Sequence, residues 1–388
     1  MILYHSRNFE SMRFRVMSAS ICPLLSWYES HARTLPWRIL PAQSRKGEIP
    51  VPYRVWLSEI MLQQTTVKAV IPYFEKFTKK WPTLHALAQA NPEEIFEQWA
   101  GLGYYTRAKN LIACSKIISE RQNGFPRDVQ SLKQLPGIGD YTAAAIAAIA
   151  FNIPDAIAVD ANIRRIVSRL YGFANPSHAM IRETSRNIIH NHCIGDHTQA
   201  LMDLGSLVCT SRLPSCRTCP LMNTCTAYKT DNILAFPAPA LKKRKKNVFG
   251  TFFFVINDSN EVLIITRPDT GMLSGMLSLP STQWDKIKSD KTISETSTID
   301  HPFLNLQHLT QSLSIHIIPE KFHHEFTHLS LCGTVWLIRC IDKTDYQTNA
   351  VSFRWVSLSK ISDLGLPSVM RKAVHIGLHF LEKTITCH

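Results

Sequence analysis

Apolar residues recur every three or four positions through most of the first two-thirds of the chain, which is the pattern of amphipathic helices. Pairs such as Asn91-Pro92 and Pro136-Gly137 separate these segments and predict the turns between them. We therefore predict an all-α first part, with helices over residues 56–66, 84–90, 92–99, 108–120, 141–150 and 163–171.

The pattern changes near residue 230. Phe236-Pro-Ala-Pro and the run Leu241-Lys-Lys-Arg-Lys-Lys246 predict a basic linker that is stiffened by proline. Beyond it, short apolar runs bounded by turn residues predict β-strands, and one amphipathic helix closes the chain. We expect an α+β second part, with strands at 249–257, 261–266, 313–318, 331–341 and 351–357 and a helix at 367–382.

Composition and charge point to a class of partner. The 388 residues are enough for two or three domains, and Lys and Arg outnumber Asp and Glu by 43 to 30, a net charge of +13. This excess favours a polyanion, with nucleic acid as the first candidate. We expect no membrane span. We interpret the first twenty residues as a loose tail or as sequence upstream of a start at Met12 or Met17, with a mitochondrial presequence as the alternative.

The cysteines predict one metal centre. Four of the ten form the pattern C-x6-C-x2-C-x5-C, and the others are scattered, which indicates a reduced compartment rather than a disulfide framework. Four close thiolates can hold Zn²⁺ or a [4Fe-4S] cluster. Zinc sites usually use two C-x-x-C pairs, and only one is present, so the spacing favours iron–sulfur. The predicted ligands are Cys209, Cys216, Cys219 and Cys225.

The segment Leu135-Pro-Gly-Ile-Gly-Asp140 predicts a helix-hairpin-helix between two helices. We expect Gly137 and Gly139 to take backbone conformations that other residues resist. The amides at the start of the following helix would then bind a phosphate without reading any base. An ordinary helix–helix turn is the alternative.

Two acidic residues are candidates for catalysis. Asp160 ends an apolar segment and opens a helix, so it is either a plain N-cap or a carboxylate that steadies positive charge on a sugar. Glu59 is expected to share one helix face with Gln63 and Thr66 among apolar neighbours. Apolar surroundings raise the pKa of a carboxyl, as a general acid requires. A solvent-facing Glu on an amphipathic helix is the alternative.

Together these segments resemble the MutY-type adenine DNA glycosylases of the endonuclease III-like, helix-hairpin-helix superfamily. The match begins near Leu24 and also includes Leu35-Pro-Trp-Arg38, Trp99-Ala-Gly-Leu-Gly-Tyr-Tyr-Thr-Arg107 and Gln199-Ala-Leu-Met-Asp-Leu-Gly205. The resemblance implies an enzyme of base excision repair that flips adenine out of the duplex and hydrolyses its N-glycosidic bond where it is mispaired with 8-oxoguanine or guanine. It also implies a [4Fe-4S] cofactor, double-stranded DNA as partner and a monomer.

The resemblance implies a multidomain fold. A tail at 1–20 precedes an all-α glycosylase domain at 21–229, with the helix-hairpin-helix at about 131–150 and the iron–sulfur loop at 209–225. A basic linker at 230–247 leads to an α+β, Nudix-like, 8-oxoguanine-recognition domain at 248–388. Arg267-Pro-Asp-Thr-Gly271 and Leu279-Pro280 carry the Nudix likeness. The glutamate-rich box of true Nudix hydrolases is missing from this sequence, so we expect no nucleotide hydrolysis.

The catalytic roles follow the family. Glu59 would protonate adenine N7, and Asp160 would stabilise the oxocarbenium-like sugar, electrostatically or through a transient bond, before water completes the hydrolysis. Tyr141 and Asn162 would assist Asp160. Strand-nicking relatives have a Schiff-base Lys at the position of Tyr141. A phenol cannot form that bond, so we predict a monofunctional enzyme that leaves an intact abasic site.

Binding roles also carry over to matching positions. Gln64 and Tyr104 resemble residues that wedge into the duplex. The adenine pocket would be lined by Trp37, Arg38, Leu62, Gln199 and Met202, with core packing as the alternative for Trp37, Leu62 and Met202. The segment Phe322–His328 resembles the loop that reads 8-oxoguanine through Phe326, Thr327 and His328. The sequence departs from the family at Thr327 (usually Ser), Leu277 (commonly aromatic) and Ala161 (usually Gly).

Two other functions stay open at this point. One is an endonuclease III-like glycosylase-lyase for oxidised pyrimidines, against which Tyr141 and the second domain argue. The other is a non-catalytic lesion-binding protein, against which Glu59 and Asp160 argue. The linker residues Lys242–Lys246 either add DNA affinity or form a solvated hinge. We expect a cytoplasmic, nucleoid-associated protein in a bacterium, or an organellar or nuclear one in a eukaryote.

Overall fold

The computed structural model describes residues 22–189, 193–239, 244–268, 271–286, 314–326, 328–340 and 352–385. The chain divides into two compact units. The first consists of Met1–Val55, Arg127–Leu132 and Gly139–Pro239, and the second of Trp56–Pro126, Lys133–Ile138 and Ala240–His388. The predicted tail and residues 240–243 of the predicted linker lie outside the described residues.

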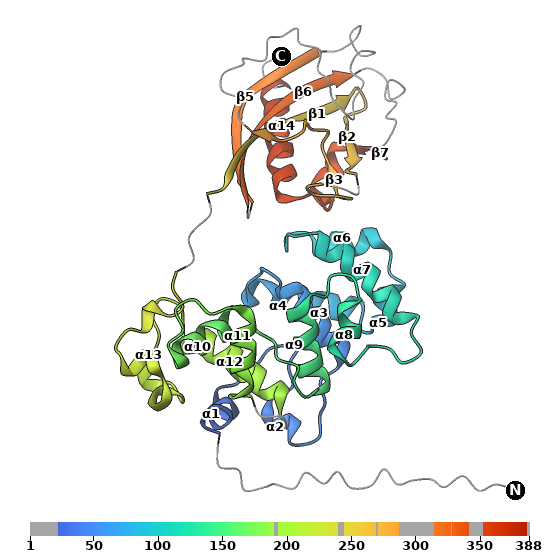
Figure 1. Cartoon of the computed structure of the whole chain (residues 1–388). Coiled ribbons are helices and arrows are strands. Elements are labelled where there is room, and N and C mark those ends of the chain that lie inside the picture. The colour runs from blue at the N-terminus through green and yellow to red at the C-terminus, as the bar shows by residue number, and fades with distance from the viewer. Residues whose placement is uncertain are drawn as a thin grey trace, which may run out of the picture. The chain divides into compact units, whose positions relative to one another are not determined.

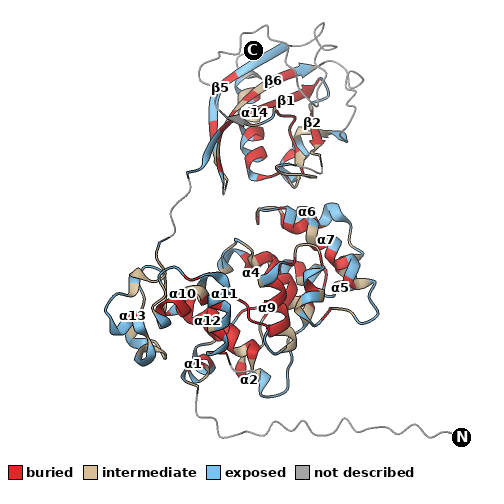
Figure 2. Cartoon of the chain, in the orientation of Figure 1, coloured by how far each residue is buried: buried red, intermediate tan, exposed pale blue. Residues whose placement is uncertain are grey.

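Helix α12 (Ile194–Leu207) is the core of the first unit. It is buried from Ile194 to Gly205 except at Asp196 and packs against α1, α9 and α10 (Figures 1 and 2). An added Cβ at Gly195 would lie 2.9 Å from the carbonyl oxygen of Ala148, so this glycine allows the close approach of α9. The helices of this unit are α1 (Pro23–His31), α2 (Pro41–Ser44), α8 (Val129–Lys133), α9 (Asp140–Phe151), α10 (Ala161–Tyr171), α11 (His178–Arg186) and α13 (Thr226–Lys229).

The helical part of the second unit packs around buried aromatic rings. Phe77 lies edge-on to Trp99, with ring centroids 5.8 Å apart. Such pairs stabilise a core beyond the area they bury. Thr66, Thr83 and Asn91 cap the helices that follow them through side-chain oxygens. The helices are α3 (Pro52–Leu62), which begins in the first unit, then α4 (Val67–Lys80), α5 (Leu84–Ala88), α6 (Pro92–Trp99) and α7 (Thr106–Ser119).

One helix prediction is wrong at its end. The helix expected over 56–66 stops at Leu62, because Gln64 has a left-handed backbone with φ of 58°. Thr66 then caps α4 by accepting a hydrogen bond from the amide of Ala69 at 3.4 Å. Gln63 and Thr66 therefore do not share a helix face with Glu59, as the sequence had led us to expect.

The β part of the second unit is a mixed sheet. Among the described residues its strand order is β3-β2-β1-β6-β5, with β4 paired to β1 and β7 to β2. Strands β1 and β6 are parallel, and the other pairs are antiparallel. The strands are β1 (Lys246–Asn257), β2 (Glu261–Thr266), β3 (Leu277–Ser278), β4 (Asp285–Lys286), β5 (Ser314–Glu325), β6 (Leu329–Cys340) and β7 (Phe353–Ser357).

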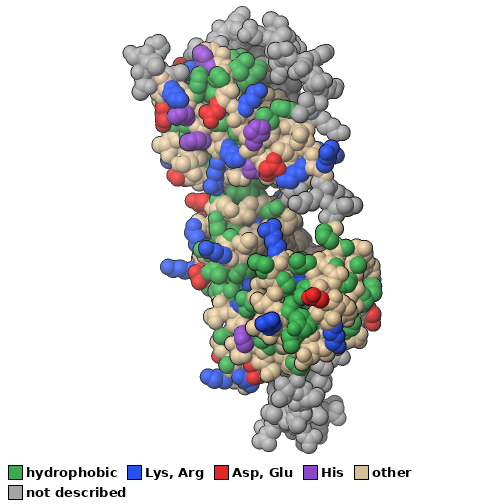
Figure 3. All heavy atoms as spheres, turned by 90° about the vertical axis from the view of Figure 1, so that its left-hand side faces the viewer, with side chains coloured by type: hydrophobic (Ala, Val, Ile, Leu, Met, Phe, Trp, Pro, Cys, Tyr) green, Lys and Arg blue, Asp and Glu red, His purple; other side chains and the backbone are tan. Residues whose placement is uncertain are grey.

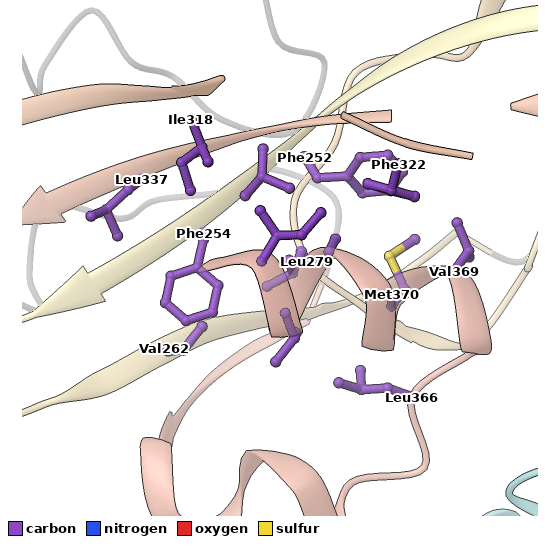
Figure 4. Packing of buried hydrophobic residues seen from close by; sticks show 14 of the residues in the cluster. Phe252, Phe254, Val262, Leu279, Ile318, Phe322, Leu337, Leu366, Val369 and Met370 are labelled. Atoms are coloured by element: carbon purple, nitrogen blue, oxygen red, sulfur yellow. The ribbon is translucent and has the colours of Figure 1, made fainter. Parts of the chain in front are cut away.

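Helix α14 (Ser368–Ile385) covers one face of this sheet. Its residues Val369 and Met370 pack with Phe252, Phe254 and other sheet residues in one apolar cluster (Figure 4). A Cβ at Gly377 would lie 2.5 Å from Cδ2 of Phe254, so the glycine lets the helix lie close to the strand. The predicted all-α and α+β parts are thus confirmed, while the domain boundaries stay predictions.

Strand β5 corrects a second expectation. The strand predicted at 313–318 runs to Glu325 and pairs with β6 along its length, with an irregularity between Ile317 and Lys321. The predicted reading loop at 322–328 is therefore strand up to Glu325, and Thr327 lies outside the described residues. Within the parts of the chain that are described, none of the helices has the length and apolar character needed to span a membrane.

Candidate active site

Asp160 caps a helix, and hydrogen bonds fix the orientation of its carboxylate. It precedes α10, and its Oδ1 accepts a hydrogen bond from the amide of Ile163 at 2.6 Å. Its Oδ2 accepts one from Nδ2 of Asn162 at 3.0 Å. Burial raises the pKa of Asp160, and these hydrogen bonds offset part of that rise. The N-cap interpretation is therefore correct, and the same bonds orient the carboxylate.

Arg165 lies behind this pair. Its Nη2 donates to Oδ1 of Asn162 at 2.8 Å and to the carbonyl of Gly205 at 2.7 Å, and its Nε donates to the carbonyl of Cys209 at 2.8 Å. A Cβ at Gly205 would lie 2.5 Å from Cβ of Asn162, so a side chain there would displace the amide. One chain of hydrogen bonds thus links the Asp160 carboxylate to the backbone of the first predicted metal ligand.

Most of the predicted pocket residues of the first unit are buried. Trp37, Gln199 and Met202 are almost fully enclosed. Tyr141, in the first turn of α9, packs against a cluster that contains Ala144, Ala145 and Ala158. Core packing remains the alternative for Trp37 and Met202.

Arg38 belongs to a buried ion cluster that sequence reasoning missed. Its Nη1 binds Oδ2 of Asp203 at 2.7 Å, and Nε of Arg33 binds Oδ1 at 2.6 Å. Asp203 lies on α12 and is fully buried, so removing Asp203 would leave the buried charge of Arg38 uncompensated, at a cost of about 3–5 kcal/mol. A signal was present, because Asp203 is an acidic residue between Met202 and Leu204 in an otherwise apolar helical segment.

Glu59 is buried in the second unit. Its side chain is 6% exposed on α3, between fully buried Leu57 and Met61. The solvent-facing alternative for this residue is therefore wrong. Leu62, which ends the helix, is partly exposed. Nε2 of Gln63 donates to the carbonyl of Gly137 at 3.3 Å, which ties the end of α3 to the hairpin.

The hairpin joins α8 to α9 at the predicted place. Gly137 has φ of 76°, and a Cβ there would lie 2.8 Å from Cβ of Asn110, so this position requires glycine. Gly139 corrects our expectation, because its φ of −87° is open to any residue. It caps α9, is exposed, and has open space where a Cβ would stand. Backbone amides at such a helix start suit an anion.

The four predicted metal ligands line one small cavity of the first unit. Cys209 follows α12, Cys216 and Cys219 flank a short turn of helix, and Cys225 precedes α13. The lining is completed by Arg169, Val208, Met222, Tyr228 and Ile233. No set of three His, Cys, Asp or Glu side chains in the described ranges is placed to hold a single ion. Four thiols that line one cavity suit a [4Fe-4S] cluster as well as a single Zn²⁺ ion.

Phe326 directly follows β5, and His328 directly precedes β6. The Phe326 ring packs against His324 and Trp284, with centroid distances of 4.6 and 5.7 Å. Glu325, at the end of β5, accepts hydrogen bonds from Lys245 at 2.6 Å and from Ser330 at 2.5 Å. The Lys245–Glu325 pair is exposed, so solvent screens the attraction between its charges and the pair adds little to stability. It nevertheless connects the predicted linker to the end of β5.

Lys and Arg side chains are scattered over the face shown in Figure 3, among hydrophobic and His side chains. Gln64 and Tyr104, the two predicted wedge residues, are both exposed in the second unit. Both have left-handed backbones, with φ of 58° and 48°.

Comparison with known proteins assigns the class. Residues 57–191 match the family model described as HhH-GPD superfamily base excision DNA repair protein. Residues 251–375 match that of a NUDIX domain. A solved structure of a thermostable thymine-DNA glycosylase matches 54% of this chain and 94% of its own length, at 26% identity and a TM-score of 0.47. The fold and these models define a helix-hairpin-helix base excision repair protein with a Nudix-like domain.

Curated relatives narrow the class to a family. The adenine DNA glycosylase of Buchnera aphidicola subsp. Baizongia pistaciae is 32% identical over 361 residues, which cover 90% of this chain and 94% of the relative. The human adenine DNA glycosylase is 29% identical over 91% of this chain and 73% of its own length. The chain belongs to the adenine DNA glycosylase family, and it is a DNA N-glycosylase of base excision repair. Proteins of this family normally carry a [4Fe-4S] cluster.

Proposed function

We propose that this protein, acting as a monomer, hydrolyses the N-glycosidic bond of adenine mispaired with 8-oxoguanine or guanine in double-stranded DNA. The observation that carries the proposal is the Asp160 carboxylate, which hydrogen bonds from Ile163 and Asn162 hold in place. The bacterial and human relatives of this chain are named adenine DNA glycosylases, which supports adenine as the base that is released. Tyr141 supplies no amine for a Schiff base, which supports simple hydrolysis with an intact abasic site as product.

The proposed mechanism divides the chemistry between two acids. Glu59, buried among apolar residues, donates a proton to N7 of the extruded adenine and makes the base a better leaving group. Asp160 is ionised and stabilises positive charge on the sugar, with its orientation set by Asn162 and, behind it, by Arg165. Water then attacks the sugar. That the two acids meet around one adenine is part of the proposal.

A base-release assay tests the proposal. Duplexes with adenine opposite 8-oxoguanine, guanine and thymine are incubated with the protein, with and without hot alkali. We expect release of adenine from the first two and strand breaks only after alkali. Breaks without alkali that borohydride traps on the protein would contradict monofunctional hydrolysis, and release from the adenine·thymine duplex at an equal rate would contradict mispair selectivity.

We also propose that Cys209, Cys216, Cys219 and Cys225 hold a [4Fe-4S] cluster. Support comes from their common cavity and from the family. When bound, the cluster supplies iron–thiolate bonds that tie the loop together. Elemental analysis of the purified protein should find iron and acid-labile sulfide, with an absorption band near roughly 400 nm. Stoichiometric zinc in place of iron would contradict the assignment.

The hydrogen bond from Asn162 to Asp160 predicts a pH effect. Burial raises the pKa of Asp160, and the bond from Asn162 lowers it, so the Asn162→Ala variant should have a still higher pKa. Activity requires the ionised form and is lost as pH falls through that pKa. The acid limb of the single-turnover rate should therefore move to higher pH. Exposed Asn123→Ala is the control and should keep the wild-type profile. An acid limb at the wild-type position in Asn162→Ala would refute the link.

A further inference from the structure

Two turns of the second unit carry exposed residues with a strained backbone. Gln64 lies in the turn between α3 and α4, and Tyr104 lies in the turn before α7, with its side chain 46% exposed. A left-handed conformation is strained for a non-glycine residue, so it persists only where the surroundings hold it. The two turns are far apart in the sequence, and neither contains glycine at the strained position.

Arg107 binds both turns at once. Its Nη2 donates to Oγ1 of Thr65 at 3.1 Å, next to Gln64, and to the carbonyls of Leu102 at 3.1 Å and Gly103 at 3.2 Å, next to Tyr104. The guanidinium also lies over the ring of Tyr104, 5.4 Å from its centroid. Cation–π contacts of this kind add attraction between the two groups.

The same guanidinium also binds the end of α3. Its Nη1 donates to the carbonyls of Ile60 at 3.0 Å and Met61 at 2.6 Å, the two residues that directly follow Glu59. Arg107 is only 7% exposed, and burial lowers its pKa to about 10, so it stays charged at neutral pH. A planar fork with five donors can bridge so many acceptors, whereas the ammonium of Lys cannot.

We propose that Arg107 is a positioning residue that locks the Gln64 and Tyr104 turns and the Glu59 end of α3 into one rigid element, with which the protein opens the duplex beside its target base. The inference rests on the proposed function, because a rigid element of this kind is needed only if the enzyme extrudes its target adenine from the duplex. A charge buried among carbonyls is costly to keep, and the three segments it joins are the ones that extrusion and protonation of a base would use together.

Thr65→Val is the sharpest test, because it removes one hydroxyl from this network and leaves Arg107 in place. The matched control is Thr78→Val, whose hydroxyl binds the carbonyl of Phe74 at 2.9 Å within α4. Both are combined with Asp160→Asn so that the adenine stays attached to its sugar. 2-Aminopurine beside the target adenine becomes fluorescent when stacking is lost, and it reports opening of the duplex.

Loss of the hydrogen bond between Arg107 and Thr65 corresponds to about a fivefold change in an equilibrium constant. We expect Thr65→Val to lower the opened fraction by about that factor, with affinity for undamaged duplex and melting temperature as in the Thr78→Val control. In the background with Asp160 intact, the single-turnover rate should fall by a similar factor, and an unpaired bubble around the adenine should restore it. Arg107→Lys should open the duplex less than Thr65→Val.

Equal opening by Thr65→Val and the control would overturn the inference, as would an equal loss of rate on paired and unpaired adenine. The two proposals fail separately. If the wild-type chain releases no adenine from any mispair, the proposed function is wrong. If it does, and Thr65→Val opens the duplex like the wild type, only the role of Arg107 is wrong.

Discussion

Replacing Asp160 with Asn is expected to slow adenine release about a thousandfold while the protein still binds the mispair. The reason is electrostatic, since an amide has nearly the same shape as the carboxylate but cannot neutralise a cationic sugar, and losing one such interaction costs about 10²–10³ in rate. The variant keeps an oxygen that can accept the amide of Ile163, so the cap of α10 should survive. Single-turnover kinetics and a mobility-shift titration on an adenine·8-oxoguanine duplex measure the two effects.

The chain offers a matched control for this variant. Asp128 caps α8 with the same geometry, its Oδ1 accepting the amide of Ser131 at 2.8 Å, and it is exposed. Asp128→Asn changes charge and cap in the same way and should leave the rate unchanged. Equal losses in both variants would mean that Asp160 acts only as a cap, and an active Asp160→Asn would rule out charge stabilisation.

Local signals predicted those elements whose ends are set by local chemistry. Helix α6 begins and ends where predicted because Asn91 caps it and Pro92 starts it, and strand β2 at Glu261–Thr266 likewise has the predicted bounds. The end of α3 could not be predicted in this way. The left-handed backbone of Gln64 is held by Arg107, a residue far along the chain, and no pattern around Gln64 reports that contact.

The predicted end of strand β5 was wrong for a related reason. Pro319-Glu-Lys321 looks like a turn in the sequence, and the exposed residues around it hide any alternation. The strand continues because β6 pairs with it on both sides of an irregularity that absorbs these residues. Strand pairing is a long-range interaction, so the local pattern gave no sign of the continuation.

The residues of the candidate site also fall into two groups, those that local sequence patterns predicted and those that only the fold revealed. Glu59, Asp160 and the four cysteines stand in local patterns that suggest their chemistry. The apolar segment around Asp203 hints that this carboxylate is buried, but only the fold shows its two arginine partners. Arg165 looks like an ordinary surface residue in the sequence, and only the fold shows that it links Asn162 to Cys209. Residues that position others depend on partners far away in sequence, and this is why sequence reasoning missed them.

Replacing Glu59 with Gln is expected to lower the rate of adenine release by about 10²–10⁴, the range over which a general acid contributes. The amide is close in size to the carboxyl, so the buried packing around α3 should hold and the melting temperature should change little. Single-turnover rates on the adenine·8-oxoguanine duplex measure the loss, and thermal unfolding measures the stability.

A substrate change tests which atom Glu59 serves. In 7-deazaadenine a carbon replaces N7, so the wild-type protein should lose a similar factor on that base for lack of a proton acceptor. The two changes remove the same proton transfer, and together they should cost little more than either alone. If Glu59→Gln slows the 7-deazaadenine substrate by its full factor again, the two losses are independent, and Glu59 acts on some atom other than N7.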